Sequence, residues 1–182
     1  METRSGETLK ARYTAKAAAM LATVAAAGML AAPSAQAQTY QQKSAPQNCV
    51  IVIDKAGKVK SQRCSSDPAE LEAISAASTP IIQLFDLPHF GGVATIIRGE
   101  GNVGGGDGCD YAGYRISHLG SWVNRTSSFI TRHGCNAVNL HNLPNYGDHG
   151  HGFRNPGAAT ISVPVMPAGF DNNVESIALW RM

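Results

Sequence analysis

The chain lacks a hydrophobic run long enough to serve as a transmembrane helix. Its first apolar stretch covers residues 17–32 and is mostly alanine, which is shorter than the ~20 residues that cross a bilayer. Basic residues precede this stretch and Ser34-Ala35-Gln36-Ala37 follows it, a pattern typical of a signal peptide that is cleaved after Ala37. We therefore predict that residues 1–37 are a signal peptide. The mature protein is expected to be secreted and free of the membrane, with the periplasm as the alternative compartment.

The mature chain also lacks an excess of either charge. Removal of residues 1–37 takes away four of the 15 basic and two of the 13 acidic residues, so that 11 of each remain. No basic stripe interleaved with aromatic residues is left, and a nucleic-acid partner is therefore disfavoured. We expect a monomer.

No Cys-x-x-Cys pair is present, which disfavours a structural zinc site. The four cysteines are Cys49, Cys64, Cys109 and Cys135. An even number of cysteines in an exported chain favours two disulfides. Residues 49–53 and 59–64 are β-rich runs on either side of a turn, and a hairpin between them places Cys49 opposite Cys64. We predict the disulfide Cys49–Cys64 and, for the remaining two cysteines, Cys109–Cys135.

Long helical periodicity is missing as well. The clearest helix start is Asp67-Pro68-Ala69-Glu70, where Asp67 can cap the helix and Pro68 suits its first position; this helix should end near residue 76. Glycine, proline, asparagine and aspartate separate the short β-like runs that follow, at residues 81–85, 93–97, 127–131, 137–140, 160–165 and 176–180. We predict an all-β protein, with a flexible lead, a hairpin and a short helix in residues 38–79 and a compact sandwich in residues 80–182.

One motif is present twice in this second part. Leu-Phe-Asp-Leu-Pro-His-Phe-Gly at residues 84–91 recurs as Leu-His-Asn-Leu-Pro-Asn-Tyr-Gly at residues 140–147. A polar loop follows each copy, at residues 123–128 and 172–177. Repetition of both elements in the same order indicates duplication of a small β motif, two copies of which share a core. Within the first copy, Phe85 and Phe90 can stack across the turn.

The aromatic hairpin, followed by a loop of the type Asn/Asp-Asn/Asp-x-x-Ser/Thr-Ser and present twice, resembles the βγ-crystallins. Residues 119–129 and 134–140 are especially similar to their secreted bacterial members. The resemblance covers residues 80–182. It implies two Greek key motifs that form a βγ-crystallin-like two-sheet sandwich. It also implies one or two calcium sites, each built by the polar loop of one motif and by backbone of the other.

The resemblance implies calcium ligands at Asn124, Ser127, Asn172, Asn173 and Ser176. Alignment of residues 123–128 with residues 172–177 pairs Ser127 with Ser176, and it leaves Val123 at a position where the family has Asn or Asp. The second hairpin has His141 in place of the first aromatic residue and Asp148 in place of the glycine. With no carboxylate at the leading positions of either loop, calcium should bind weakly, with a Kd of roughly 10⁻⁴–10⁻³ M.

Other interpretations of these residues remain open. Asn and Ser side chains also cap turns by bonding to nearby backbone. His141, His149 and His151 lie close to Asp148 in sequence and could bind zinc or copper. Residues 99–104 match a dinucleotide fingerprint, but the glycine-rich segment that follows them is a poor helix start.

We expect a protein that is not an enzyme, because no nucleophile lies on a recognisable strained turn. The function predicted from the sequence is calcium binding that stabilises a secreted structural domain. Some secreted bacterial domains similar to this fold inhibit metalloproteinases, so the first alternative is inhibition of an extracellular protease through residues 99–108 or 142–145. A killer-toxin-like interaction with a cell envelope is the second alternative.

Overall fold

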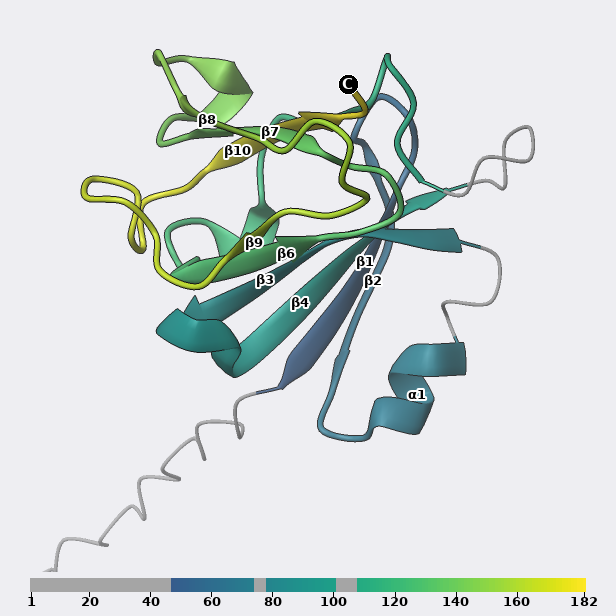
Figure 1. Ribbon diagram of the computed structural model, residues 1–182. Coiled ribbons are helices and arrows are strands. Elements are labelled where there is room, and N and C mark those ends of the chain that lie inside the picture. Colours follow the sequence, from purple (N-terminus) through teal and green to yellow (C-terminus); the bar gives the residue numbers. More distant parts are fainter. Residues whose placement is uncertain (1–46, 74–77, 101–107) are drawn as a thin grey trace, which may run out of the picture. The chain divides into compact units, whose positions relative to one another are not determined.

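The computed structural model describes residues 47–73, 78–100 and 108–182, all of which belong to one compact unit, Gln42–Met182 (Figure 1). The predicted signal peptide and its cleavage site lie outside the described residues, as do residues 101–107 of the glycine-rich segment. In the described part of the chain, no helix has both the length and the apolar character that a membrane span requires.

The described residues form an all-β structure, which confirms the predicted fold class. The strands are β1 (Asn48–Ile53), β2 (Val59–Ser65), β3 (Ser78–Leu87), β4 (Gly91–Glu100), β5 (Tyr114–Ile116), β6 (Ser128–Thr131), β7 (Ala137–His141), β8 (His151–Arg154), β9 (Ser162–Val163) and β10 (Ser176–Trp180). The helices are α1 (Pro68–Ala73) and three single 3₁₀ turns, η1 (Pro88–Phe90), η2 (Gly120–Trp122) and η3 (Pro144–Tyr146). Each predicted β-like run contains a strand, whereas β5 and β8 were not predicted.

The strands form two sheets, with the orders β2-β1-β4-β3-β6-β9 and β5-β10-β7-β8. Strands β3 to β6 and β7 to β10 are two successive sets of four. In each set the third strand leaves its own sheet: β5 pairs with β10, and β9 pairs with β6. The two sets are thus joined by an exchange of strands, and neither sheet belongs to one set alone (Figure 1).

The hairpin of β1 and β2 extends the larger sheet. Strand β1 pairs antiparallel with β2 and parallel with β4; this parallel pairing was not predicted. The register places Cys49 opposite Cys64, and the disulfides Cys49–Cys64 and Cys109–Cys135 confirm both predicted pairs. At the turn, Gly57 has a φ of +79°, and a Cβ there would lie 1.5 Å from the carbonyl oxygen of Arg115. Only glycine therefore fits where this hairpin meets β5.

The hydrophobic core takes side chains from both sheets. Isoleucines and leucines of the larger sheet meet valines, isoleucines and leucines of the smaller one, among them Ile82, Leu84, Ile97, Leu140, Ile177 and Leu179. Trp122, Tyr114 and Phe129 are also fully buried. Burial of each such side chain contributes roughly 1.5–3 kcal/mol, and because residues of both duplicated sets contribute, the core depends on both being present.

Helix α1 begins as predicted but packs loosely. The Oδ1 atom of Asp67 accepts a hydrogen bond from the backbone N–H of Ala69 at 2.9 Å, which is an N-cap interaction. No residue of α1 is buried, and Leu71 is half-buried. The helix is described up to Ala73; the predicted end near residue 76 lies outside the described residues.

Candidate functional site: the paired polar loops

The two hairpins of the duplicated motif have the same backbone conformation. In η1, His89 and Phe90 have φ values of 56° and 61°; in η3, Asn145 and Tyr146 have values of 54° and 61°. The left-handed region is uncommon for residues other than glycine, so two consecutive residues in it at equivalent places indicate a shared, tertiary cause.

The cause is a buried serine at each hairpin, Ser128 at the first and Ser176 at the second. The Oγ atom of Ser128 donates to the carbonyl oxygen of Leu87 at 2.7 Å and accepts from the N–H of Phe90 at 3.0 Å. The Oγ atom of Ser176 donates to the carbonyl oxygen of Leu143 at 2.7 Å and accepts from the N–H of Tyr146 at 3.1 Å. Each serine thus closes one hairpin, and Ser128 and Ser176 are structural equivalents.

This equivalence corrects the sequence alignment of the two polar loops by one residue. The alignment paired Ser127 with Ser176, and that pairing is wrong. Asn124 and Asn172, with φ values of 56° and 50°, are the matching left-handed residues, four positions before Ser128 and Ser176. In the corrected register Glu175 matches Ser127, and Asp171 matches Val123. The second loop therefore does carry a carboxylate at its leading position, contrary to the expectation.

Reciprocal hydrogen bonds join the two loops. The backbone N–H of Asn124 donates to the carbonyl oxygen of Val174 at 2.9 Å, and the N–H of Asn172 donates to the carbonyl oxygen of Thr126 at 3.0 Å. Since Thr126 and Val174 are equivalent in the corrected register, the two bonds are related by the symmetry of the duplication. Each loop therefore holds the other in place.

The side chains follow the same symmetry. The Oγ atom of Ser127 donates to Oδ1 of Asn172 at 3.3 Å. The Nδ2 atom of Asn124 donates to Oε1 of Glu175 at 3.3 Å. We call these the serine pair (Ser127 and Asn172) and the glutamate pair (Asn124 and Glu175). Each pair takes one side chain from each loop.

The structure divides the predicted ligands into two groups. Asn124, Ser127 and Asn172 lie in the two pairs, whereas Asn173 and Ser176 do not. The Nδ2 atom of Asn173 donates to the carbonyl oxygen of Gly169 at 2.8 Å, so this side chain caps its own turn. Ser176 is fully buried and its hydroxyl closes the hairpin. The sequence analysis missed Glu175, which only the corrected register could have identified.

A cation lies beside the first loop. The guanidinium of Arg125 stacks over the ring of Trp122 at 4.6 Å, and its Nη2 lies 3.3 Å from Oδ2 of Asp86. Among the described residues, two buried side-chain polar atoms have no hydrogen-bond partner, Nε1 of Trp122 and Oγ1 of Thr126. Trp122 directly precedes this loop, and Thr126 belongs to it. Turn capping therefore does not engage every polar side chain of this loop, because the hydroxyl of Thr126 has no partner among the described residues.

The donor chemistry of the two pairs suits a hard cation. The available oxygens are one hydroxyl and one amide oxygen in the serine pair, and one carboxylate and one amide oxygen in the glutamate pair. Calcium prefers oxygen ligands and completes its shell with backbone carbonyls and water. The glutamate pair fits calcium better, because it brings a negative charge, whereas the serine pair is neutral.

The histidines do not gather in the way a zinc or copper site requires. The Nδ1 atom of His141 binds Asp148, while the ring of His151 packs against Phe153 and Phe170 at 4.9 and 5.4 Å between centroids. In the three described ranges, no group of three or more His, Cys, Asp or Glu side chains is placed to hold a metal ion.

No family model matches the chain, and no curated protein matches its sequence.

Proposed function

We propose that the mature protein is a secreted βγ-crystallin-like domain of two Greek key motifs, in which calcium binds at the paired polar loops and stabilises the fold. The observation that carries the proposal is the reciprocal bonding of Asn124 with Val174 and of Asn172 with Thr126. It is supported by the exchange of β5 and β9 between the sheets, which is the arrangement expected of two interlocked Greek keys.

The location of the loops explains why an ion there would act on stability. Glu175 and Asn124 would hold the ion at one site, and Ser127 and Asn172 at the other. Each pair exists only when both halves of the duplicated unit are folded together. An ion that binds the folded state alone raises the free energy of unfolding by mass action.

Secretion is the other part of the proposal. Two disulfides are typical of an oxidising compartment outside the cytoplasm. Together with the sequence pattern of residues 1–37, they support export of the mature chain.

Thermal unfolding with calcium and with a chelator tests the proposal. At a calcium concentration about ten times the Kd, one site adds roughly 1.4 kcal/mol, which raises the Tm by about 5 °C for a domain of this size. The Glu175→Gln variant should lose most of this gain. Glu70→Gln, which removes the same charge from the exposed helix α1, should keep it. If the wild-type Tm is the same in calcium and in chelator, calcium binding at the loops is refuted.

Inhibition of an extracellular protease is a second candidate, favoured by the loop at residues 109–113. Tyr111 is 82% exposed at the tip of this loop. The loop is held by the disulfide Cys109–Cys135 and by Asp110, whose Oδ1 accepts the N–H of Gly113 at 2.7 Å and whose Oδ2 lies 3.0 Å from Nζ of Lys55. A rigid loop that presents one large side chain can enter a protease cleft with little loss of conformational entropy.

Incubation with a metalloprotease and a short peptide substrate tests this candidate. Inhibition that is lost in Tyr111→Ala, but kept in Val165→Ala, which also changes an exposed apolar side chain, would support it. Equal inhibition by both variants, or none by the wild type, would contradict it.

A further inference from the structure

A cavity of about 510 Å³ lies between helix α1 and the larger sheet, far from the polar loops in sequence. Its floor is the face of the sheet that points away from the core. Ile51, Ile53 and Ile97 of β1 and β4 belong to the core cluster, while their neighbours Val50 and Ile96 line the cavity. Successive side chains of a strand point to opposite faces, so the two sets are on opposite sides of the sheet.

The helix covers this face without filling it. Leu71 and Pro68 of α1 line the cavity, and neither is buried. Ile96 on the floor is only half-buried. Protein interiors are otherwise packed with few voids larger than a water molecule, and the volume lies in the range of roughly 300–1,000 Å³ that is usual for small-molecule sites.

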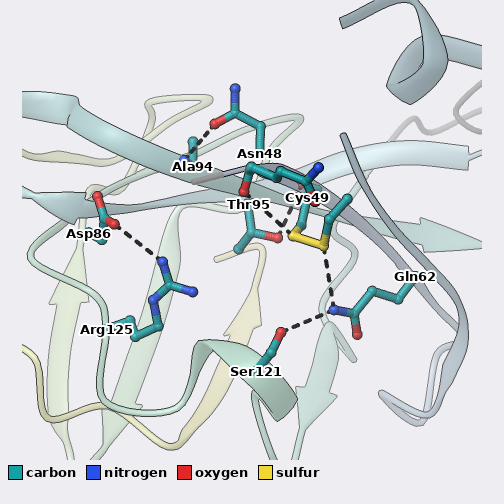
Figure 2. The surroundings of a disulfide bond; sticks show 10 residues. Asn48, Cys49, Gln62, Asp86, Ala94, Thr95, Ser121 and Arg125 are labelled. Carbon is teal, nitrogen blue, oxygen red and sulfur yellow. Dashed lines mark hydrogen bonds and ion pairs between the residues drawn. A yellow bond between two sulfur atoms is a disulfide. The ribbon is translucent and has the colours of Figure 1, made fainter. Parts of the chain in front are cut away.

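The side-chain amides of Asn48 and Gln83 line the cavity, and the oxygen of each accepts a hydrogen bond from elsewhere in the protein. The Oδ1 atom of Asn48 accepts from the N–H of Ala94 at 2.9 Å, and Oε1 of Gln83 accepts from Nη2 of Arg132 at 2.8 Å. Figure 2 shows the oxygen of Asn48 turned toward Ala94 and its nitrogen turned away. Because a backbone N–H and a guanidinium can only donate, the orientation of both amides is fixed.

Each amide therefore presents its NH₂ group as a hydrogen-bond donor. Among the described residues, no acceptor bonds to either NH₂ group. The charged residues of the lining are Arg98 and Glu72, one of each sign, so the cavity carries no net charge. The Nε atom of Arg98 donates to Oγ of Ser78 at 3.0 Å.

We propose that this cavity binds a small, neutral and mainly apolar molecule that carries a carbonyl oxygen, as in an ester, a lactone or an amide. Its apolar part contacts Val50, Ile96 and Leu71. Its carbonyl oxygen accepts hydrogen bonds from the NH₂ groups of Asn48 and Gln83. An anionic ligand gains nothing from a lining without net charge. An alcohol should bind less well, because its oxygen is a weaker acceptor than a carbonyl oxygen for the two NH₂ donors.

Titration of the purified protein with γ-decalactone, followed by NMR of backbone amides, side-chain amides and methyl groups, tests the proposal. Saturable shifts are expected at the methyl groups of Val50, Ile96 and Leu71 and at the side-chain amides of Asn48 and Gln83. Decanoate and 1-decanol, which have the same number of carbon atoms, should bind at least fivefold more weakly. Ile96→Trp, which places a large side chain over the floor, should abolish the shifts.

Two near-isosteric variants test the donors without breaking bonds within the protein. In Asn48→Asp and Gln83→Glu, a carboxylate oxygen can still accept from Ala94 or Arg132, but the NH₂ donor is gone. Each should weaken lactone binding about fivefold, which corresponds to the loss of one neutral hydrogen bond. Gln62→Glu makes the same change on strand β2 outside the cavity lining and should bind as the wild type does.

Three results would overturn the proposal. The first is the absence of saturable shifts at the lining residues. The second is binding of decanoate as tight as that of the lactone, or binding unchanged in both donor variants. The third is the presence, in the protein without ligand, of NOEs from residues 38–46 or 74–77 to the methyl groups of Val50 and Ile96, because the chain itself would then fill the cavity.

Discussion

The Nδ1 atom of His141 lies 2.8 Å from Oδ1 of Asp148. In the first hairpin Phe85 and Gly92 stand in their places, and the structure shows that the two residues of the second hairpin bind each other. His141 still packs edge-on against Tyr146, with 5.5 Å between the rings, as Phe85 does against Phe90 at 5.6 Å. The second hairpin thus keeps the aromatic geometry of the first and adds a polar contact.

The contact between His141 and Asp148 should give a measurable coupling free energy between the two residues. His141→Phe and Asp148→Ala each remove one partner of a contact that is mostly buried on the histidine side. In a double-mutant cycle, measured by urea unfolding, the double variant should lose less stability than the two single losses added together. We expect a coupling of about 0.5–2 kcal/mol. Additive losses would show that the two residues act independently.

The stability of the second hairpin should also depend on pH. Burial raises the pKa of Asp148, but hydrogen bonds from the N–H of Asn142 and from His141 outweigh it, and the net pKa is below the usual value. The pKa of Asp110 is lowered as well, mainly by the hydrogen bond from Lys55. Carboxyl groups with a folded pKa below the unfolded value stabilise the fold above the unfolded pKa, and this contribution is lost as the pH falls through the folded pKa.

The stabilisation contributed by these two carboxylates should therefore be present from neutral pH down to about 4, near their unfolded pKa, and should be lost as the pH falls further. Urea unfolding of the wild type and of Asp148→Asn at pH 7 and at pH 3 measures this contribution. The variant should be less stable than the wild type at pH 7, and the difference should shrink at pH 3. An equal difference at both values would mean that the charge of Asp148 has no role.

Ser128 and Ser176 should be structural rather than metal-binding residues. Replacement of either by Ala removes two hydrogen bonds, one to the carbonyl of Leu87 or Leu143 and one from the N–H of Phe90 or Tyr146. The expected loss is about 1–3 kcal/mol and should be the same with calcium and with chelator. If Ser176→Ala loses stability only in the presence of calcium, Ser176 is a ligand after all.

The serine pair and the glutamate pair should differ in their response to calcium. Ser127→Ala removes a neutral oxygen ligand, whereas Glu175→Gln removes a negative charge. The number of charged ligands influences calcium affinity. In calorimetric titrations, Glu175→Gln should therefore weaken calcium binding more than Ser127→Ala does. The opposite ranking of the two variants would mean that the neutral pair is the main site.

The hairpin disulfide should contribute substantially to stability. Cys49 and Cys64 close a loop with a sequence separation of 15, for which the entropy of the unfolded chain predicts roughly 3 kcal/mol. The double variant Cys49→Ser with Cys64→Ser should unfold at a correspondingly lower urea concentration. A change below about 0.5 kcal/mol would show that pairing of β1 with β4 holds the hairpin without the disulfide.

The sequence by itself determined the local features of this protein. Alternating apolar residues set most of the strands, the turn at Gly57 aligned Cys49 with Cys64, and Asp67 with Pro68 began helix α1, because each of these depends on residues close together in the chain. The duplication was also readable, since its hairpin motif recurs in the same order at 84–91 and 140–147, with Leu, Leu, Pro and Gly at equivalent positions.

Only the tertiary structure decided how these parts combine. The exchange of β5 and β9 and the parallel pairing of β1 with β4 join segments that no local pattern links. The short strands β5 and β8 were not predicted from the sequence at all. The register of the polar loops was decided by the hydrogen bonds of Ser128 and Ser176 to distant backbone. With the register corrected by one residue, Ser176 closes a hairpin and Glu175 takes a place in the candidate site. Sequence similarity between two short loops could not fix this register, because it is set by hydrogen bonds to residues that lie far away in the chain.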